Sequence, residues 1–196
     1  MTNSLGSLLS ERAKTTCPLL PPIYTIRYKS PLGELELGSI GDRLCLCLWP
    51  YSVHYEAIRR RLAKGFNATF VDGQWTDVLH CAVEELKQYF FRAYDMNPLP
   101  LRTFGTPLQQ EVWRQVARIP TGCTVSYSEL AALAGHPAAV RAVASAVGAN
   151  ALNLFIPCHR VLPADGSLGN YAGLPYCKYR LLRLEGVDIE YHRRIP

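Results

Sequence analysis

The fold of the C-terminal half is decided by VSYSELAALAGHPAAVRAVASAVGA, residues Val125–Ala149. Ser126 and Glu129 have the spacing of a capping box, which predicts a helix that starts here, and Gly135 suits the left-handed residue that ends it. Pro137 fits the first position of a second helix, which we expect to run to the end of the stretch. Two helices joined by a glycine-containing turn are typical of a helix-turn-helix, but on spacing alone an ordinary helical hairpin fits equally well.

The second predicted helix has one apolar face and one smooth face. At about 100° per residue, the side expected to face the core carries Val140, Val143, Ala144 and Val147. The opposite side carries Arg141 as its one long side chain, among the small residues Ala138, Ala142, Ser145, Gly148 and Ala149. A reader of the major groove needs side chains that reach base edges, whereas a smooth helix can closely approach a narrow minor groove. The pattern favours shape-tolerant DNA binding with a single probing arginine.

A candidate nucleophile lies further along the chain, in the segment PCHR at Pro157–Arg160. It follows a short apolar strand predicted over Leu152–Ile156, and a histidine and an arginine beside a cysteine favour the thiolate. Taken alone, the dipeptide Cys158-His159 is better explained by a buried structural cysteine that happens to precede a histidine. Downstream, Asn170–Gly173 is predicted to be a loop that could wall a pocket. A final helix is predicted over Lys178–Gly186, and its Glu185 taken alone is a surface carboxylate.

The N-terminal half predicts a small antiparallel sheet with helices. Strands separated by turn signals are expected at Tyr24–Tyr28, Glu34–Leu37 and Leu44–Trp49. Helices are expected at His54–Lys64 and Thr76–Tyr94. Cys45 and Cys47 are two residues apart on the last of these strands, so we expect both to pack inward from the same face.

Length and composition predict two domains and a substantial core. Apolar residues make up 48% of the 196 residues and charged residues 19%, which excludes a wholly disordered chain. We expect a loose leader over residues 1–22, a sheet-and-helix domain over 23–100 and a second domain over 101–196, with a linker that starts at Pro98–Pro100. The strand and helix patterns together predict an α/β fold.

Charge and cysteine usage limit the partners and the compartment. Most of the net charge of +5 lies after residue 100, which favours an anionic partner, with nucleic acid first. The seven cysteines are an odd number without a C-x-x-C pair, so a disulfide scaffold is not expected. No apolar run approaches the roughly 20 residues of a membrane span, and no secretory signal is visible. We therefore expect a cytoplasmic protein, or a nuclear one in a eukaryote.

Together these motifs resemble one family. The segment IPCHRV, Ile156–Val161, is preceded by Val125–Gly135 and Arg141–Val143 and followed by Gly169–Gly173 and Leu181–Gly186. This order and spacing closely resemble the O6-alkylguanine-DNA alkyltransferases, also called methylated-DNA–protein-cysteine methyltransferases. The resemblance covers about residues 104–187 and extends more loosely to residues 23–49. It implies an N-terminal antiparallel sheet with helices that is ribonuclease H-like, and a mainly helical C-terminal domain that is winged helix-turn-helix-like.

The resemblance implies a suicide reaction in DNA repair that needs no cofactor. A monomer binds duplex DNA, flips out O6-alkylguanine, and transfers the alkyl group irreversibly to its own cysteine, once per molecule. O4-alkylthymine is a further candidate substrate. Cys158 matches the acceptor, His159 the residue that takes its proton through a water, and Glu185 the group that orients His159. Tyr127 matches the residue that donates a proton to the leaving guanine, and Asn150 matches the hinge before the active-site strand.

The resemblance also implies a DNA interface and a base pocket. Arg141 matches the finger that fills the gap left by the flipped base. Further contacts to the minor groove are expected from Tyr127, Ser128, His136, Ala142 and Ser145. The base pocket is expected to be formed by Val161, Tyr171, Ala172 and Gly173.

Six residues at four sites differ from the family pattern. Leu174-Pro175 stands where many members have a second glycine, and Asn153 stands where many have proline. Ala144-Ser145 replaces a pair that often contains glycine. Ile40 stands where zinc-containing members have cysteine, so neither a structural zinc nor another metal is expected.

Two other classes of protein compete with this interpretation. A non-catalytic protein, either a helix-turn-helix regulator or a lesion sensor, would bind DNA without alkyl transfer. Such a protein has no need for Cys158 and His159 with a distant Glu185. A Cys-His hydrolase would turn over repeatedly, and it has no need for Arg141 on a smooth helix.

Overall fold

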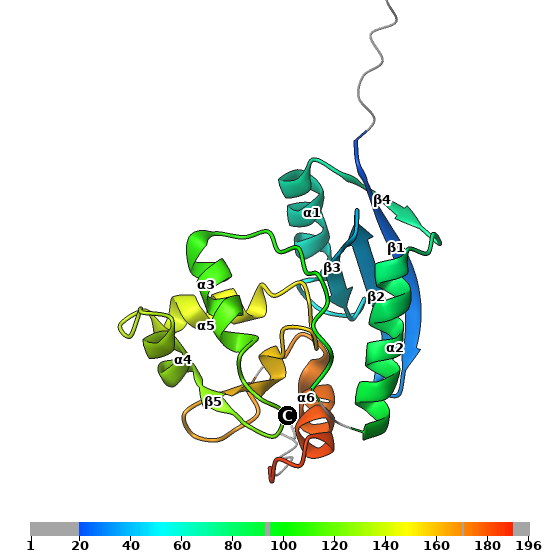
Figure 1. The fold of residues 1–196 in the computed structure, drawn as a ribbon. Helices are drawn as coiled ribbons and strands as arrows, with labels where there is room; N and C mark the ends of the chain where they lie inside the picture. The colour runs from blue at the N-terminus through cyan, green and yellow to red at the C-terminus, as the bar shows by residue number, and fades with distance from the viewer. Residues whose placement is uncertain (1–19, 93–94, 170, 190–196) are drawn as a thin grey trace, which may run out of the picture.

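The computed structural model describes residues 20–92, 95–169 and 171–189 of the chain. Most of the predicted leader, residues 1–22, lies outside these ranges. Tyr94, the last residue of a predicted helix, and Asn170, the first residue of a predicted loop, also lie outside them. The described residues form a sheet with two long helices beside a second, mainly helical part (Figure 1). The predicted α/β class is therefore confirmed.

The N-terminal part is a mixed sheet with strand order β3-β2-β1-β4. Its elements are β1 (Pro22–Ser30), β2 (Gly33–Ile40), β3 (Arg43–Leu48), α1 (Tyr55–Phe66), β4 (Thr69–Asp72) and α2 (Asp77–Arg92). The first three strands pair antiparallel as the predicted meander, and both predicted helices are present. Strand β4 was not predicted; it has four residues and pairs parallel to β1, so the sheet is mixed rather than antiparallel as predicted.

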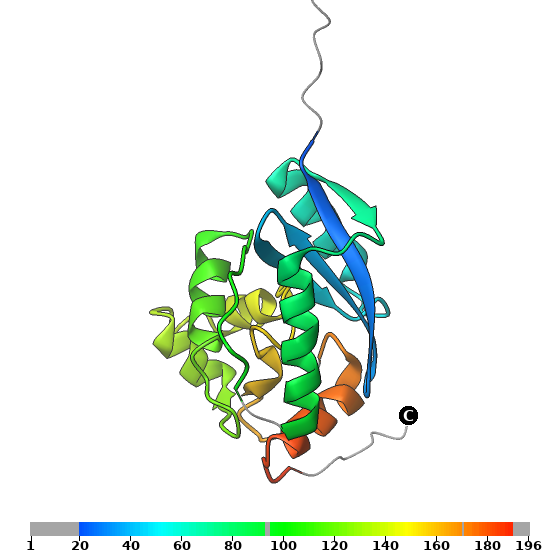
Figure 2. The ribbon, with the colours of Figure 1, turned by 45° about the vertical axis from the view of Figure 1, so that its right-hand side comes forward.

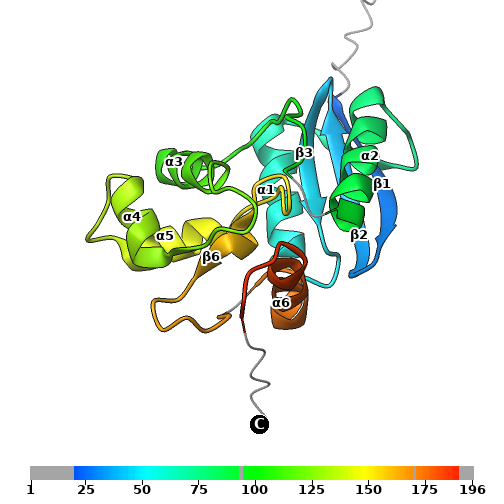
Figure 3. The same ribbon diagram turned by 60° about the horizontal axis from the view of Figure 1, so that its bottom comes forward.

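The two helices cover opposite faces of the sheet (Figure 3). Ile58 and Leu62 of α1 belong to one apolar cluster with Leu46 of β3. On the other face, α2 packs in a larger cluster that extends into the C-terminal part of the molecule. Figure 2 shows α2 lying across this face, with its C-terminal end next to α6. This end of α2 therefore lies beside the elements that carry the candidate site.

The prediction that Cys45 and Cys47 share one face is wrong. The pairing of β2 with β3 shifts register, because Gly38 pairs with Leu46 while Ser39 pairs with Leu44. Cys45 is thus an extra residue without an opposite partner, and such a bulge changes the alternation of the strand. Cys45 packs in the α1 cluster and Cys47 in the cluster that contains the C-terminal part.

The C-terminal part begins with a helix, α3 (Pro107–Val116). The elements that follow are β5 (Val125–Ser126), α4 (Tyr127–Leu133), α5 (Val140–Gly148), the short 3-10 helix η1 (Cys158–Arg160), β6 (Val161–Leu162) and α6 (Leu174–Leu184). The capping box is confirmed: the Glu129 N–H donates to Ser126 Oγ at 3.1 Å, and the Ser126 N–H donates to the Glu129 carboxylate at 2.7 Å. Gly135 has a φ of +77°, as expected for the left-handed residue after the helix.

Three predicted boundaries differ from the structure. Helix α5 begins at Val140 rather than Pro137, because the Ala139 N–H closes a separate turn on the His136 carbonyl at 2.8 Å. Residues 152–156 do not form a strand, because Leu154 has a left-handed φ of +74° and folds the chain into a turn. Helix α6 begins at Leu174 rather than Lys178, and its proline occupies the first turn, where no N–H is needed.

The edge strand β3 joins the two parts through the backbone. The Cys47 N–H donates to the Ala151 carbonyl at 2.8 Å, and the Asn153 N–H donates to the Cys47 carbonyl at 2.9 Å. Near the other end of β3, the Leu44 N–H donates to the Pro100 carbonyl, and the Arg102 N–H donates to the Leu44 carbonyl. Because these bonds cover the open edge, the sheet fixes the segment that leads to the candidate nucleophile. No helix among the described residues is both long and apolar enough to cross a membrane.

Candidate active site

Cys158 lies at the start of η1 and is only 5% exposed. Its thiol donates to Asn153 Oδ1 at 3.4 Å. Burial raises the pKa of this thiol, against the opposing effects of a hydrogen bond with Asn150 and the positive charge of Lys178. The resting residue is therefore a thiol, and a reaction at its sulfur requires a base to take the proton.

Asn150 holds the loop that positions Cys158. It is 1% exposed; its Nδ2 donates to the Ile156 carbonyl at 2.8 Å, and its Oδ1 accepts from the Leu152 N–H at 2.9 Å. One side chain thus bridges both ends of the turn between α5 and the cysteine. The hinge role that the resemblance implies for Asn150 stays a prediction.

Glu185 is a buried carboxylate and not the surface residue that it resembles when taken alone. Its Oε1 is 2.8 Å from His159 Nε2 and accepts from the Tyr89 hydroxyl at 2.6 Å. The guanidinium of Arg160 reaches both carboxylate oxygens, at 3.0 and 2.9 Å. Burial alone would raise the pKa of Glu185, but its hydrogen bonds with His159, Arg160 and Tyr89 lower it to about 2.

These bonds fix the tautomer of His159. Because an ionised carboxylate can only accept hydrogen bonds, the proton of the neutral imidazole lies on Nε2, facing Glu185. Burial lowers the pKa of His159, although the neighbouring carboxylate acts in the opposite direction. The ring is therefore neutral near pH 7, and its buried Nδ1 has no hydrogen-bond partner within the described structure. A nucleophile, a base with a free lone pair and an orienting carboxylate are present together.

Three further buried residues support this site. Tyr89 and Lys178 were not predicted, and Arg160, which was predicted to favour the Cys158 thiolate, binds Glu185 instead. Tyr89 lies in the apolar stripe of α2, where no sequence signal marks its hydroxyl as a hydrogen-bond donor. Arg160 also donates to the Ile119 carbonyl and to Thr121, and it pairs with Asp95 at 3.6 Å. Lys178 is fully buried, donates to the Val161 carbonyl at 2.7 Å, and has its pKa lowered to about 8 by burial.

The predicted base-pocket residues lie next to the histidine. The Tyr171 ring is 6.3 Å from the His159 ring and 5.6 Å from Trp49, both measured between centroids. A Cβ at Gly173 would lie 2.7 Å from the Trp49 ring, so only glycine fits there without movement. Ala172 lies between them and is half-buried. Val161 directly follows η1, three residues after Cys158 in the chain.

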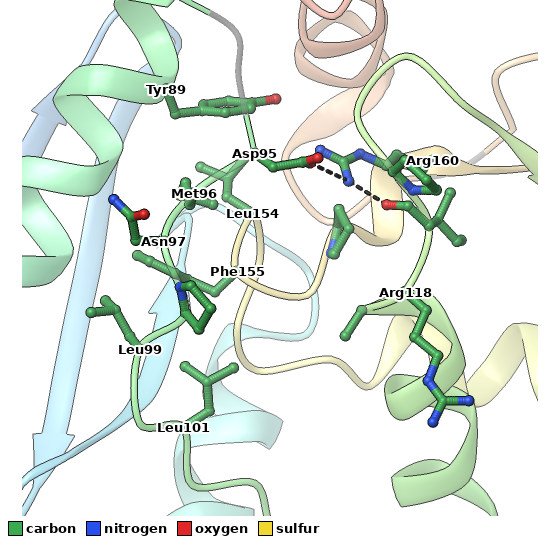
Figure 4. Close-up of a pocket in the computed structure, with 15 residues that line it drawn as sticks. Tyr89, Asp95, Met96, Asn97, Leu99, Leu101, Arg118, Leu154, Phe155 and Arg160 are labelled. Carbon is green, nitrogen blue, oxygen red and sulfur yellow. Dashed lines mark hydrogen bonds and ion pairs between the residues drawn. The ribbon is translucent and has the colours of Figure 1, made fainter.

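A separate pocket of about 380 Å³ lies on the other side of the Glu185 network. Its walls include Tyr89, Leu154, Phe155 and Arg160, and the ion pair of Asp95 with Arg160 crosses its edge (Figure 4). Neither Cys158 nor the four predicted base-pocket residues line it. This pocket is therefore not the predicted site of the base.

The predicted DNA-facing residues form a solvent-exposed surface. Ser128, His136, Arg141, Ala142 and Ser145 are all exposed. On the other side of α5, Val143 and Val147 are buried as predicted, while Val140 and Ala144 are half-buried and Ala146 joins the core. Tyr127 is half-buried at the start of α4, and burial raises the pKa of its hydroxyl, which therefore keeps its proton.

No group of three or more metal-binding side chains occurs within residues 20–92, 95–169 and 171–189. The absence of a metal stays a prediction, which elemental analysis of chelator-free protein can test.

The fold and the site together are those expected of a DNA-binding protein with a candidate nucleophilic cysteine. The family model described as 6-O-methylguanine DNA methyltransferase, DNA binding domain, matches residues 107–187. The constitutive methylated-DNA–protein-cysteine methyltransferase of Bacillus subtilis is 46% identical over 153 residues, which cover 76% of this chain and 87% of that protein. The chain belongs to the methylated-DNA–protein-cysteine methyltransferase family. The predicted family and class of activity, DNA repair by alkyl transfer, are thereby confirmed.

Two further relatives show how the chain relates to whole proteins. The regulatory protein ada of Salmonella typhimurium is 54% identical over 87 residues, but the chain spans only 25% of its length. The crystal structure of Mycobacterium tuberculosis OGT in complex with DNA superposes with a TM-score of 0.70 at 32% identity, covering 83% of this chain and 92% of that one. The similarity to OGT thus includes both the sheet and the helical part.

Proposed function

We propose that this protein removes the alkyl group from O6-alkylguanine in duplex DNA and keeps it on Cys158, once per molecule. The observation that carries the proposal is the buried contact between Glu185 and His159, the residue that directly follows the buried Cys158. His159 Nδ1 takes the thiol proton through a water, and Glu185 stabilises the imidazolium that forms. The sulfur then forms a bond to the alkyl carbon while the bond from that carbon to O6 breaks. Tyr127 donates a proton to the leaving guanine.

The DNA is held by the surface around α5. This surface is smooth apart from Arg141, which supports an approach to the minor groove rather than base reading in the major groove. Arg141 fills the gap in the stack when the lesion is flipped into the pocket of Val161 and residues 171–173. The structure of the mycobacterial relative in complex with DNA supports DNA as the partner. O4-alkylthymine is a second candidate lesion for the same pocket.

The finer description of the molecule is part of the same proposal. Residues 1–22 are a leader, residues 23–100 form a ribonuclease H-like domain, and residues 101–196 form a winged helix-turn-helix-like domain. The protein acts as a monomer without a cofactor. Because its substrate is DNA, it acts in the bacterial cytoplasm, or in the nucleus of a eukaryote.

Weighing the intact protein tests the proposed reaction. After incubation with duplex DNA that contains O6-methylguanine, each molecule is expected to gain the mass of one CH2 unit and no more, because a methyl group replaces the thiol proton. The same DNA must lose the methyl group in equal amount. A non-catalytic lesion sensor would bind this DNA without any change in mass, and a hydrolase would process excess substrate while its own mass stayed constant.

Replacing Arg141 by alanine is expected to separate binding from repair. Most of the affinity comes from contacts to phosphates, so binding to unmodified duplex and its salt dependence should be largely kept. Transfer from a normally paired lesion should be lost, because nothing occupies the stack after the base leaves. The measurement compares single-turnover transfer with equilibrium binding, and a mispaired lesion, which is easier to extrude, should be partly repaired. Full-rate repair of a paired lesion would reduce Arg141 to a phosphate contact.

A further inference from the structure

Arg61 links the N-terminal sheet part to the end of the DNA-contact helix. It lies on α1, and its Nη2 donates to the Ala149 carbonyl at 2.7 Å. Its neighbour Arg59 pairs with Glu36. Arg60 is exposed and has neither an ion pair nor a hydrogen bond to another described residue. Of the three consecutive arginines, Arg61 is thus the one directed at the C-terminal part.

The acceptor of this bond is a helix end. Ala149 directly follows α5, and the last carbonyls of a helix have no partner inside the helix. These carbonyls carry the negative end of the helix dipole, which a cation stabilises. Helix α5 has no basic residue in its last turn. Arg61 of α1 therefore supplies the hydrogen-bond donor and the positive charge at this helix end.

A second side chain holds the same helix end. Trp113 of α3 donates from its indole Nε1 to the Ala146 carbonyl at 2.8 Å. The Arg61 guanidinium lies 5.4 Å from the centre of the Trp113 ring, within the range of a cation–π contact. The final turn of α5 is thereby fixed against both α1 and α3.

Placing the Arg61 guanidinium here costs free energy of desolvation. The side chain is half-buried, burial lowers its pKa, and its Nε has no hydrogen-bond partner within the described structure. None of the ion pairs found among the described residues includes Arg61. Removing a charge from water without a counter-ion costs free energy, so the contacts of Arg61 with Ala149 and Trp113 must offset that cost.

The position of the bond along the chain suggests its purpose. Ala149 is followed by Asn150, which bridges the turn that leads to Cys158. Arg141 lies at the other end of the same helix. Arg61 thus fixes the junction between the surface that holds the DNA and the segment that holds the nucleophile.

We propose that Arg61 is a positioning residue that sets the distance between the DNA-contact helix and Cys158. This proposal rests on the proposed function. A flipped base reaches the sulfur only if α5 holds the duplex at the correct depth, whereas a free O6-alkylguanine base needs only the pocket. Loss of Arg61 should therefore slow transfer from duplex DNA and leave transfer from the free base unchanged.

The test compares Arg61→Met with the matched control Arg60→Met, which removes the same charge from the same helix at an exposed position. Single-turnover rates are measured with duplex O6-methylguanine and with free O6-benzylguanine, and unfolding is followed in parallel. For Arg61→Met we expect a loss on the order of tenfold with duplex DNA, because a hydrogen bond from a charged group is lost, and an unchanged rate with the free base. Arg60→Met should match the wild type with both substrates. Arg61→Lys keeps the charge without the planar fork and should lie in between.

Each other outcome contradicts the proposal in a recognisable way. Equal slowing with both substrates would mean that Arg61 supports the pocket or the whole fold. An unchanged duplex rate would mean that the bond to Ala149 does not matter for positioning. If Arg61→Met does not fold, Arg61→Lys decides the question by the same comparison of substrates. Failure of the wild-type protein to transfer from either substrate would overturn the proposed function itself, whatever the variants do.

Discussion

Replacing Cys158 by alanine is expected to abolish alkyl transfer completely and to leave binding to duplex DNA largely unchanged. The thiol donates one hydrogen bond, to Asn153, and it lies apart from the exposed surface of α5. Cys158 directly precedes His159, whose ring is held by Glu185. The check is intact mass after incubation with methylated duplex, together with equilibrium binding to the unmodified duplex.

The other cysteines supply the controls for this experiment. Cys177→Ala removes a buried thiol that contacts the Tyr51 hydroxyl, and Cys123→Ala removes an exposed one. Both variants should take up one methyl group per molecule, as the wild type does. Tryptic mapping that placed the group on Cys123 or Cys177 would show that the assignment of Cys158 is wrong.

The sequence predicted best those parts of the molecule whose signals are local. The capping box of Ser126 and Glu129 and the left-handed Gly135 each involve residues close in sequence, and the structure has them as expected. The exposed face around Arg141 followed from helical periodicity alone. The proximity of His159 to Glu185 did not follow from any local pattern. It was implied only by the resemblance to a family.

What the sequence could not predict depends on contacts between distant segments. The bulge at Cys45 comes from the register of β2 against β3, which neither strand shows by itself. The turn at Leu154 lies in an apolar run that has the composition of a strand. Tyr89 meets Glu185 across 96 positions of the chain, and its hydroxyl is directed there only by the packing of α2 against the C-terminal part.

The Glu185 network predicts a second large effect, on both chemistry and stability. Replacing Glu185 by glutamine removes the negative charge that orients His159 and stabilises its protonated form. Loss of such assistance to a general base is expected to slow transfer on the order of a hundredfold. Binding to unmodified duplex should not change, because Glu185 is buried away from the surface of α5. Single-turnover transfer and equilibrium binding measure the two effects separately.

Tyr89→Phe is the matched control for this substitution. It removes one hydrogen bond to the same carboxylate but leaves Glu185 ionised and in contact with His159 and Arg160. Transfer by this variant should therefore be much closer to the wild-type rate. If both variants were slowed equally, the packing of the network rather than the charge of Glu185 would control the reaction.

The free energy of unfolding should respond to Glu185→Gln in a pH-dependent way. Arg160 is 5% exposed and would lose its carboxylate partner, and breaking a buried pair typically costs about 3–5 kcal/mol. The pKa of Glu185 is about 2 in the folded protein, below the roughly 4.3 of an unfolded glutamate. The carboxylate therefore contributes its full stability above the unfolded pKa, and this contribution is lost as the pH falls towards about 2. Denaturant unfolding at a series of pH values should show the wild type and the variant converging over this acid range. A gap that stayed constant with pH, together with an unchanged transfer rate, would return Glu185 to the role of a purely structural residue.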